Sequence, residues 1–356
     1  MPPSIRVAGM DPGTSSLDLL ILEDGAVGEQ CRFTPEQMQA DPALPVHWLA
    51  ERGPFHLIAG PSGYGLPLIR AVDCTERDLT LMTLVRPDER GPGDARRQGV
   101  LGFSSLLRAL LASNLPVIFL PGAIHLPTVP PHRKINRIDL GTADKLCVAA
   151  LALAQRTRKL GIDYHAYHGC VIELGSVFTA CMVLSGGQIV DGLGGTSGPP
   201  GWRGGGAWDG ELAYLLSPLE KRDLFAGGAA SVPDAALGRQ MFRESLVKSV
   251  SGLRSLTRFD EVVLSGRLLE SEPELVEEVA ADLSLMARVM ILESLPGAWV
   301  KHAAQGAALL ADGLAGVCYA KLVEHVALKT ASGTVLDWIY HPRVETAAFT
   351  IEPQTK

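Results

Sequence analysis

The sequence predicts a two-domain α/β protein, and three observations lead to this prediction. A chain of 356 residues exceeds what one hydrophobic core usually serves, so two domains of roughly 150–200 residues are expected. Strand-like and helix-like stretches alternate along both halves, as they do in α/β domains. The order of strand, small-residue turn and strand at residues 5–25 recurs at residues 170–192, so each half carries a similar hairpin.

The composition excludes several classes of protein. With 47% hydrophobic and 20% charged residues, the chain can build sizeable cores. The net charge of −7 opposes a nucleic-acid-binding face, which needs clustered Lys and Arg. No apolar stretch reaches the roughly 18–20 residues that span a bilayer, and the cysteines form no C-x-x-C pair. We therefore expect a cytoplasmic enzyme without nucleic-acid or membrane partners and without a metal held by cysteine.

The first domain is expected to cover residues 1–165 and to open with the hairpin at residues 5–25. Further strands are predicted at residues 55–59, 79–85 and 117–120, and helices at residues 102–113 and 139–160. The glycine-rich segment 60–65 follows a strand and is interpreted as a substrate-side loop, with a plain turn as the alternative. The charged segment 86–97 is expected to be an exposed loop.

The second domain is expected to cover residues 166–356 and to repeat this design. Strands are predicted at residues 170–174, 178–184, 188–192, 260–264 and 289–292, and helices at residues 211–216, 235–256, 273–288 and 302–314. The glycine-dense loop at residues 192–210 contains Trp202 and Trp208, which either line an acceptor pocket or pack the loop. Residues 317–356 give mixed signals and are not assigned.

The turn of the first hairpin contains residues suited to a nucleotide phosphate. Gly13 lets backbone N–H groups approach an anion, and Thr14 and Ser15 add hydroxyl donors. Asp11 would repel a phosphate unless a divalent cation lay between them. The turn alone is equally compatible with an ordinary Asp-Pro-Gly hairpin, but its counterpart at residues 173–179 favours the phosphate interpretation.

Three glycine-bearing turns, at residues 11–16, 173–179 and 265–268, resemble those of the ASKHA superfamily of acetate and sugar kinases, Hsp70 and actin. Residues 11–16 are similar to the opening motif of acetate and butyrate kinases, and residues 260–266 to the strand and turn that hold adenosine. The whole chain resembles a family labelled as predicted butyrate kinases. The resemblance implies a two-domain, ribonuclease H-like ASKHA fold with ATP and Mg²⁺ in the cleft between the domains.

The resemblance also implies which residues would bind MgATP. The residues expected at the nucleotide are Asp11, Gly13, Thr14, Ser15, Gly175, Ser176, Thr179, Ser265 and Gly266, and those expected to hold Mg²⁺ through water are Asp11 and Asp191. Two positions depart from the superfamily pattern. Glu173 stands where many members have Asp or Gly, and Arg267 stands where a second glycine is common.

The acceptor side of the reaction is predicted from two segments. Asp144 lies in residues 141–145, which are similar to the Gly-Ala-Asp-Arg motif of type III pantothenate kinases, where the Asp is the catalytic base. The helix dipole alone also favours an Asp at a helix start. His125 and Arg133 belong to the basic, proline-rich segment 125–137, which either holds an anionic acceptor and the transferring phosphoryl group or forms an exposed basic loop.

These predictions combine into ATP-dependent phosphoryl transfer to a small-molecule acceptor. The resemblance favours a short-chain carboxylate and an acyl phosphate product, whereas residues 141–145 favour an alcohol with Asp144 as base. An ATPase that switches domain closure and a nucleotide-binding protein without turnover are the alternatives. The sequence does not determine the acceptor or the oligomeric state, a homodimer included.

Overall fold

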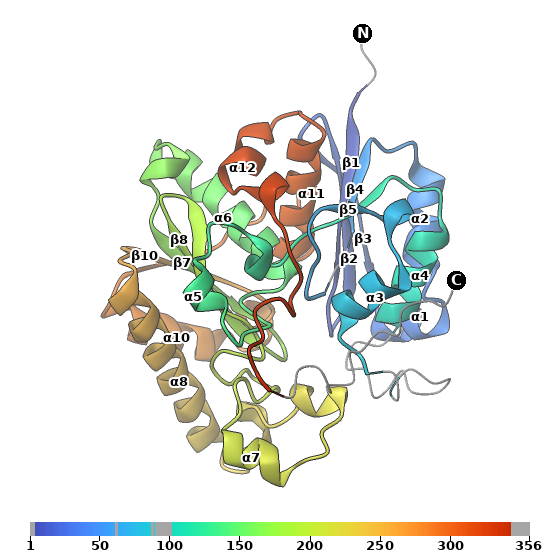
Figure 1. Cartoon of the computed structure of the whole chain (residues 1–356). Coiled ribbons are helices and arrows are strands. Elements are labelled where there is room, and N and C mark those ends of the chain that lie inside the picture. Colours follow the sequence, from blue (N-terminus) through green and yellow to red (C-terminus); the bar gives the residue numbers. More distant parts are fainter. Residues whose placement is uncertain (1–3, 61–62, 87–88, 90–101, 343–356) are drawn as a thin grey trace.

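The structure is a computed structural model that describes residues 4–60, 63–86, 89 and 102–342. Two β-sheets stand on either side of a central layer of helices (Figure 1). The first sheet has the strand order β3-β2-β1-β4-β6-β5, and the second has the order β11-β10-β7-β8-β9. In each, an antiparallel meander (β1–β3, β7–β9) continues into parallel strands.

The strands of the first sheet are β1 (Arg6–Pro12), β2 (Leu17–Glu23), β3 (Ala26–Phe33), β4 (Leu57–Gly60), β5 (Ile69–Arg70) and β6 (Val117–Phe119). Those of the second are β7 (Gly169–Leu174), β8 (Thr179–Ser185), β9 (Gln188–Leu193), β10 (Glu261–Ser265) and β11 (Arg288–Ile291). The helices are α1 (Pro35–Ala40), α2 (Leu44–Arg52), α3 (Glu76–Thr83), α4 (Phe103–Ala112), α5 (Pro131–Lys134), α6 (Ala143–Leu160), α7 (Gly210–Leu215), α8 (Ala235–Leu256), α9 (Leu268–Ser271), α10 (Pro273–Ser284), α11 (His302–Leu314) and α12 (Ala320–His325).

Most predicted elements are present, and one is wrong. The helices predicted at residues 235–256 and 302–314 coincide with α8 and α11. Residues 79–83 of the strand predicted at residues 79–85 instead belong to α3. Thr75 caps this helix by accepting from the Asp78 backbone N–H, and the Asp78 side chain accepts from the Thr75 N–H in return. This reciprocal cap stabilises a helix start, so the apolar run that follows is helical.

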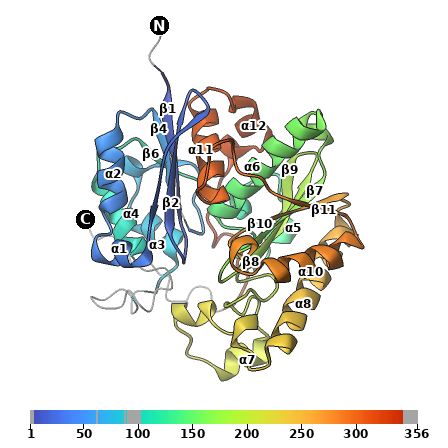
Figure 2. The same cartoon turned by 180° about the vertical axis from the view of Figure 1, so that it is seen from behind.

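Helices α6 and α11 pack side by side between the two sheets (Figures 1 and 2). Because side chains alternate along a strand, β7 directs Val171 toward this central layer and Cys170 and Ile172 toward the core beneath α8 and α10. Although α11 follows β11 in the chain, it packs on β1. The boundary between residues 165 and 166 stays a prediction.

No helix in the described ranges is long and apolar enough to cross a membrane. The six cysteines are free thiols, and Cys147, Cys170 and Cys181 are buried. Residues 61–62, most of segment 86–97 and residues 343–356 lie outside the described residues.

The central layer depends on glycines where backbones approach closely. A Cβ at Gly9 of β1 would lie 2.1 Å from the Ala308 nitrogen of α11, and a Cβ at Gly306 of α11 would lie 1.9 Å from the Cys147 carbonyl oxygen of α6. Real Cβ atoms do not come so close to backbone atoms, so both glycines are required. Their small size fixes the distance between β1, α11 and α6.

We expect Gly306→Ala to lower the free energy of unfolding by about 2–3 kcal/mol, because the added methyl group forces α6 and α11 apart. Gly252 in α8 is the matched control, since a Cβ there meets nothing within 4 Å. Gly252→Ala should instead raise the free energy of unfolding by about 0.5–1 kcal/mol through helix propensity. Urea denaturation of both variants checks this, and effects of the same sign would contradict the packing argument.

Candidate active site

A cavity of about 460 Å³ lies between the two sheets, where β1, β7 and β10 end. This volume is within the range of about 300–1,000 Å³ that is usual for small-molecule sites. The residues predicted from the sequence that line it are Asp11, Gly13, Thr14, Ser15, Asp144, Gly175, Ser176, Ser265 and Gly266. The fold therefore gathers the three glycine-bearing turns and the start of α6 around one space.

The turns of the two hairpins have the same hydrogen-bond geometry. In the first, the Gly13 N–H donates to the Ser16 carbonyl oxygen at 2.9 Å, and in the second, the Gly175 N–H donates to the Phe178 carbonyl oxygen at 3.0 Å. Each turn spans the residues between the last antiparallel pair of its hairpin. Both hairpins predicted from the sequence are therefore present, and their turns have the same hydrogen bond.

The two turns also meet across the cavity. Thr14 and Ser176 are the second residues of their turns, and their hydroxyl oxygens lie 3.1 Å apart. The Arg203 Nε donates to the Ser176 carbonyl oxygen at 3.0 Å and holds the second turn from outside. Hydroxyl groups from both halves of the chain thus meet at one point of the cavity, an arrangement that suits an anion.

The third turn follows β10 and lies beside the second. Gly266 has a φ of +109°, and a Cβ there would lie 2.4 Å from the Leu174 carbonyl oxygen, so only glycine fits. The preceding Ser265 Oγ lies 2.8 Å from His302 Nδ1. Burial lowers the pKa of His302 to about 4, so this imidazole is neutral at pH 7.

Five Asp and Glu residues line the cavity, and three of them, Asp11, Asp144 and Glu173, lie where β1 and β7 end and α6 begins. Asp11 and Glu173 are each the last residue but one of their strand, in β1 and β7. Burial raises the pKa of Asp11 and of Glu173 above the ordinary values, and the negative charge of Asp144 raises both further. The site therefore concentrates negative charge where the ends of the two strands approach α6.

Two lysines neutralise part of this charge. Lys145 Nζ lies 2.6 Å from Asp144 Oδ2 and 3.0 Å from Glu173 Oε2. Burial disfavours its ammonium, but attraction to these two carboxylates outweighs burial and raises the pKa of Lys145. Lys301 Nζ lies 2.6 Å from Asp11 Oδ2. Asp11, Asp144 and Glu173 thus each have an ammonium partner.

Lys301, the residue before α11, holds the first turn from beneath. Its Nζ donates to the carbonyl oxygens of Ser16, at 2.8 Å, and Asp11, at 3.2 Å. Its backbone N–H donates to Asp18 Oδ2 at 2.9 Å, which fixes the start of α11 to β2. A Cβ at Gly13 would lie 2.7 Å from this Nζ. A side chain at Gly13 would therefore displace the ammonium from its place under the turn.

Both carboxylate oxygens of Asp144 are occupied. Oδ2 pairs with Lys145, and Oδ1 accepts a hydrogen bond from the Thr142 hydroxyl. Burial raises the pKa of Asp144, but attraction to Lys145 and these hydrogen bonds outweigh burial, so the pKa lies below its ordinary value. A carboxylate whose pKa lies below its ordinary value is a weak proton acceptor.

Arg133 and Asp191 do not line the cavity as the described residues define it. They pair with each other, since Arg133 Nη1 lies 3.3 Å from Asp191 Oδ2 and donates to the Val190 carbonyl oxygen at 2.8 Å. Burial raises the pKa of Asp191 despite this partner. The two side chains join α5 to β9, and we leave both out of the proposed site.

His125 and Thr179 also lie outside the cavity lining among the described residues. His125 is buried, its Nδ1 lies 3.2 Å from the Gly122 carbonyl oxygen, and burial lowers its pKa to about 4. Thr179 begins β8 just past the second turn and is fully buried. A neutral, enclosed imidazole cannot neutralise a phosphoryl group, so His125 is not carried into the proposed site.

The structure also shows where Trp202 and the glycine-rich segment after β4 lie. Trp202 packs against Phe242 of α8 with ring centroids 6.2 Å apart, so packing accounts for it. Gly60, Gly63 and Tyr64 line the cavity, which agrees with a substrate-side loop after β4.

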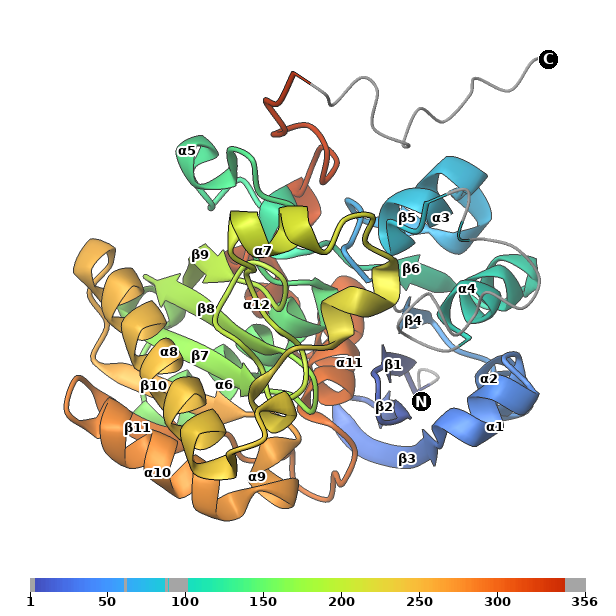
Figure 3. The same cartoon turned by 90° about the horizontal axis from the view of Figure 1, so that it is seen from below.

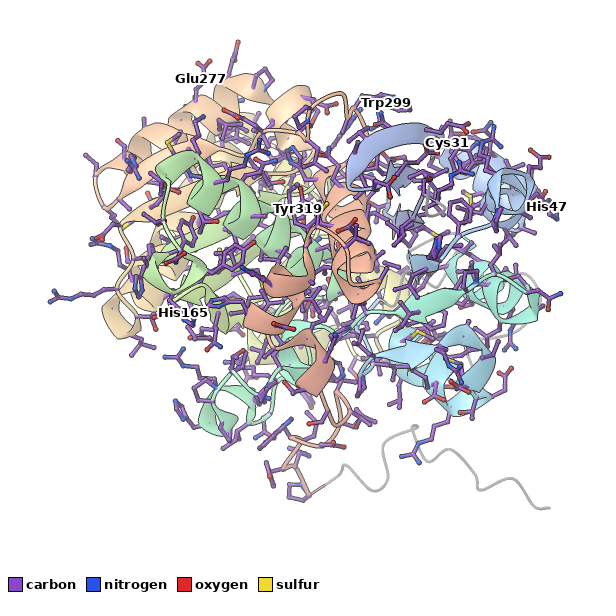
Figure 4. All side chains as sticks on the ribbon, turned by 90° about the horizontal axis from the view of Figure 1, so that it is seen from above. Cys31, His47, His165, Glu277, Trp299 and Tyr319 are labelled. Carbon is purple, nitrogen blue, oxygen red and sulfur yellow. The ribbon has the colours of Figure 1, made fainter. Side chains whose placement is uncertain are left out.

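Sequence reasoning missed Lys221, Trp299 and Lys301, which also line the cavity. Trp299 and Lys301 come from the loop after β11, and Figure 4 shows Trp299 near β3, the strand that carries Cys31. A lysine before an alanine-rich helix looks like a surface residue in one sequence. The useful signal was the loop's position after the last strand of an α/β sheet, where ligands usually bind.

The fit of a metal ion can be judged from the donor groups. Within the described ranges, no cluster of three His, Cys, Asp or Glu is arranged to hold a metal by itself. Mg²⁺ usually keeps several waters and is held by one or two carboxylates together with substrate phosphates. The carboxylate of Asp11, which lines the cavity beside the first turn, fits this role through water, whereas Asp191 does not.

The fold and the site define a protein with the two-domain ASKHA fold, as predicted. The acetate kinase of Porphyromonas gingivalis is similar in structure, with a TM-score of 0.53 and 13% identity over 79% of this chain and 88% of that chain. The acetate kinase of Entamoeba histolytica has a TM-score of 0.50 and 10% identity over 79% and 87%. A ROK family glucokinase from Streptomyces griseus, solved with glucose and AMPPNP, has a TM-score of 0.46 and 14% identity over 86% and 99%.

The chain belongs to the family described as "Protein of unknown function (DUF1464)", which matches residues 9–341. Comparison with curated proteins finds no match. The likeness to butyrate kinases stays a prediction.

Proposed function

We propose that this protein is an ATP-dependent phosphotransferase acting on a small carboxylate. The observation that carries the nucleotide half of the proposal is the contact between the two equivalent turns, with the hydroxyls of Thr14 and Ser176 3.1 Å apart. Hydroxyl donors from two glycine-bearing turns that meet in one cavity suit a polyphosphate. Gly266, which lines the cavity beside these turns, would lie next to the nucleoside.

In such a transfer, different residues of the cavity would contact the phosphates, neutralise their charge and hold Mg²⁺. Thr14, Ser15 and Ser176 would contact phosphate oxygens, and Lys301 would neutralise their charge from beneath the first turn. Asp11 would hold Mg²⁺ through water, and the ion would supply positive charge next to the phosphates. The protein's remaining contribution is positioning, because phosphoryl transfer asks little covalent chemistry of the enzyme.

The state of Asp144 supports a carboxylate acceptor over an alcohol. An alcohol must lose its proton during transfer, whereas a carboxylate is already ionised at pH 7. Because Asp144 is occupied by Lys145 and Thr142 and its pKa is lowered, it is ill-suited to take that proton. In this proposal Asp144 positions Lys145 and the start of α6.

Titration calorimetry with MgADP and a MgATP analogue tests the nucleotide half. We expect binding, and we expect Thr14→Val and Ser176→Ala each to weaken it about tenfold, since a hydrogen bond to a charged group contributes about 1.5–3 kcal/mol. Ser255→Ala, on the surface of α8, is the control and should leave the affinity unchanged. Absence of any binding at millimolar nucleotide would refute the proposal.

A further inference from the structure

One segment of the C-terminal half reaches across the cavity to the N-terminal half. It carries α7 and continues into a 3₁₀ turn at Lys221–Phe225, and Figure 3 shows it extending toward β6 and α3. The Arg86 guanidinium donates to the Leu219 carbonyl oxygen at 2.8 Å, and the Lys221 backbone N–H donates to Glu89 Oε1 at 2.7 Å. These bonds hold Lys221 over the N-terminal side of the cavity.

The ammonium of Lys221 forms part of the cavity wall. It donates to the Tyr64 hydroxyl at 2.9 Å and lies 4.4 Å from the centre of the Tyr64 ring. Among the residues that the structure describes, no carboxylate lies within ion-pair distance of this ammonium. Lys145 and Lys301, by contrast, each have a carboxylate partner. A cation without a counterion in the wall of a cavity attracts an anionic ligand.

The wall next to this ammonium is apolar. On the N-terminal side Phe103 lies close to Gly63, whose missing Cβ would be 3.1 Å from the Phe103 ring, and Met82 is beside it. On the other side the rings of Phe178 and Phe225 meet at a centroid distance of 4.9 Å. Such a surface suits a hydrocarbon chain and offers little to the many hydroxyls of a sugar.

This apolar space adjoins the phosphate end of the cavity. The Ala143 N–H at the start of α6 donates to the Gly63 carbonyl oxygen at 3.2 Å. That bond places Tyr64 next to the turn of α6 that carries Asp144 and Lys145. A ligand held by Lys221 would therefore lie between the apolar wall and the two phosphate-binding turns.

We propose that Lys221 binds the carboxylate of an aliphatic acid whose chain lies against Met82, Phe103, Phe178 and Phe225, and that this acid is the phosphoryl acceptor. The inference rests on the phosphotransferase function proposed above. In the reaction a carboxylate oxygen forms a bond to the γ-phosphorus of ATP, and the bond from that phosphorus to the bridging oxygen of ADP breaks. No proton moves, and the products are an acyl phosphate and ADP.

The test combines hydroxylamine trapping of the acyl phosphate with measurement of ADP release. Acetate, propionate, butyrate and isobutyrate are compared with glycerol and glucose in the full-length protein. We expect hydroxamate from the acids, with kcat/KM rising from acetate to butyrate as more hydrocarbon is buried. Glycerol and glucose should give no stimulation of ADP release.

Two variants separate the role of Lys221 from structural effects. Lys221→Met keeps the length of the side chain and should raise the KM for butyrate at least tenfold while MgADP affinity, measured by calorimetry, stays unchanged. Lys248→Met, on the exposed face of α8, is the matched control and should leave both quantities unchanged. Lys221→Arg, which keeps the charge, should recover part of the lost affinity for the acid.

The possible outcomes are distinguishable. If the protein binds no nucleotide, the proposed function itself is wrong. If nucleotide binds but only an alcohol stimulates ADP release, or if no acceptor gives product, the carboxylate inference is overturned. Hydroxamate formation with an unchanged KM in Lys221→Met would show that another group binds the acid.

Discussion

Replacing Lys301 by methionine is expected to lower turnover roughly 100-fold or more, the loss typical when one preorganised donor to a developing charge is removed. The Lys301 ammonium lies 2.6 Å from Asp11 Oδ2 and 2.8 Å from the Ser16 carbonyl oxygen, directly beneath the first turn. It is therefore fixed close to where the phosphates would lie. Its loss removes a positive charge from the phosphates and leaves Asp11 without its partner.

The loss of charge at the phosphates must be separated from the loss of the partner of Asp11, because an unpaired buried carboxylate destabilises the fold by itself. Asp11→Asn/Lys301→Met removes both charges and should recover most of the thermal stability lost in Lys301→Met. The decisive measurement is ADP binding without Mg²⁺. Asp11→Asn alone should bind ADP more tightly than the wild type, since a repelling charge is gone, and the double variant should bind it more weakly than Asp11→Asn. Equal affinities in these two variants would show that Lys301 only pairs with Asp11.

Replacing Glu261 by glutamine is expected to lower the free energy of unfolding by about 3–5 kcal/mol, the cost of breaking a buried ion pair. Glu261 in β10 is 3% exposed and accepts from Arg156 of α6 at 2.6 and 2.7 Å, from Tyr167 at 3.1 Å and from Arg288 at 2.7 Å. Arg156 is itself only 7% exposed. Its guanidinium would keep its charge in the variant and lose its counterion.

An exposed ion pair of α6, the helix that carries Arg156, provides the control for Glu261. Lys159 and Glu293 form an ion pair at 2.7 Å with side chains 53% and 69% exposed, so Glu293→Gln should change stability by less than about 1 kcal/mol. Arg156→Leu/Glu261→Leu should recover most of the stability lost in Glu261→Gln, because no charge is then left buried. Denaturant unfolding of the four proteins measures these differences.

The Glu261 pair also has a predicted pH dependence. Burial raises the pKa of Glu261, but its bonds with Arg156, Arg288 and Tyr167 outweigh burial, so the pKa in the folded state lies below the ordinary 4.5. The stabilisation is therefore present above pH 4.5 and is lost as the pH falls through the lowered folded-state pKa. The difference in unfolding free energy between wild type and Glu261→Gln should shrink in that window, and a difference that grows there would contradict the assignment.

Local sequence signals were sufficient for most of the fold. The hairpin around Gly13 and its counterpart around Gly175 were predicted because an apolar strand, a small-residue turn and another strand are encoded within some twenty residues each. The run at residues 79–85 failed, because its apolar residues fit either element and the cap formed by Thr75 and Asp78 decides for a helix.

The candidate site was predicted only in part. Residues that share one short turn were predicted to lie in it, whereas contacts between residues far apart in the sequence were not predicted. Thr14, Ser176 and Gly266 were found because each turn carries its own sequence signature. His125 and Arg133 were selected for their charge alone, and the structure engages them elsewhere with carbonyl groups and a carboxylate. A local basic segment does not reveal which way its side chains face.

The sequence by itself determined the two-domain α/β organisation and the three glycine-bearing turns, because backbone conformation at a turn depends on neighbouring residues. Only the tertiary structure decided which charges meet. Lys301 reaches Asp11 across 290 positions, and Lys221 reaches Tyr64 across 157. Such pairs form because sheet order and helix packing bring distant backbones together, and one sequence contains no local signal of that approach. The three glycine-bearing turns of the candidate site were therefore predictable from the chain, whereas the Lys221 ammonium and the apolar wall beside it required the fold.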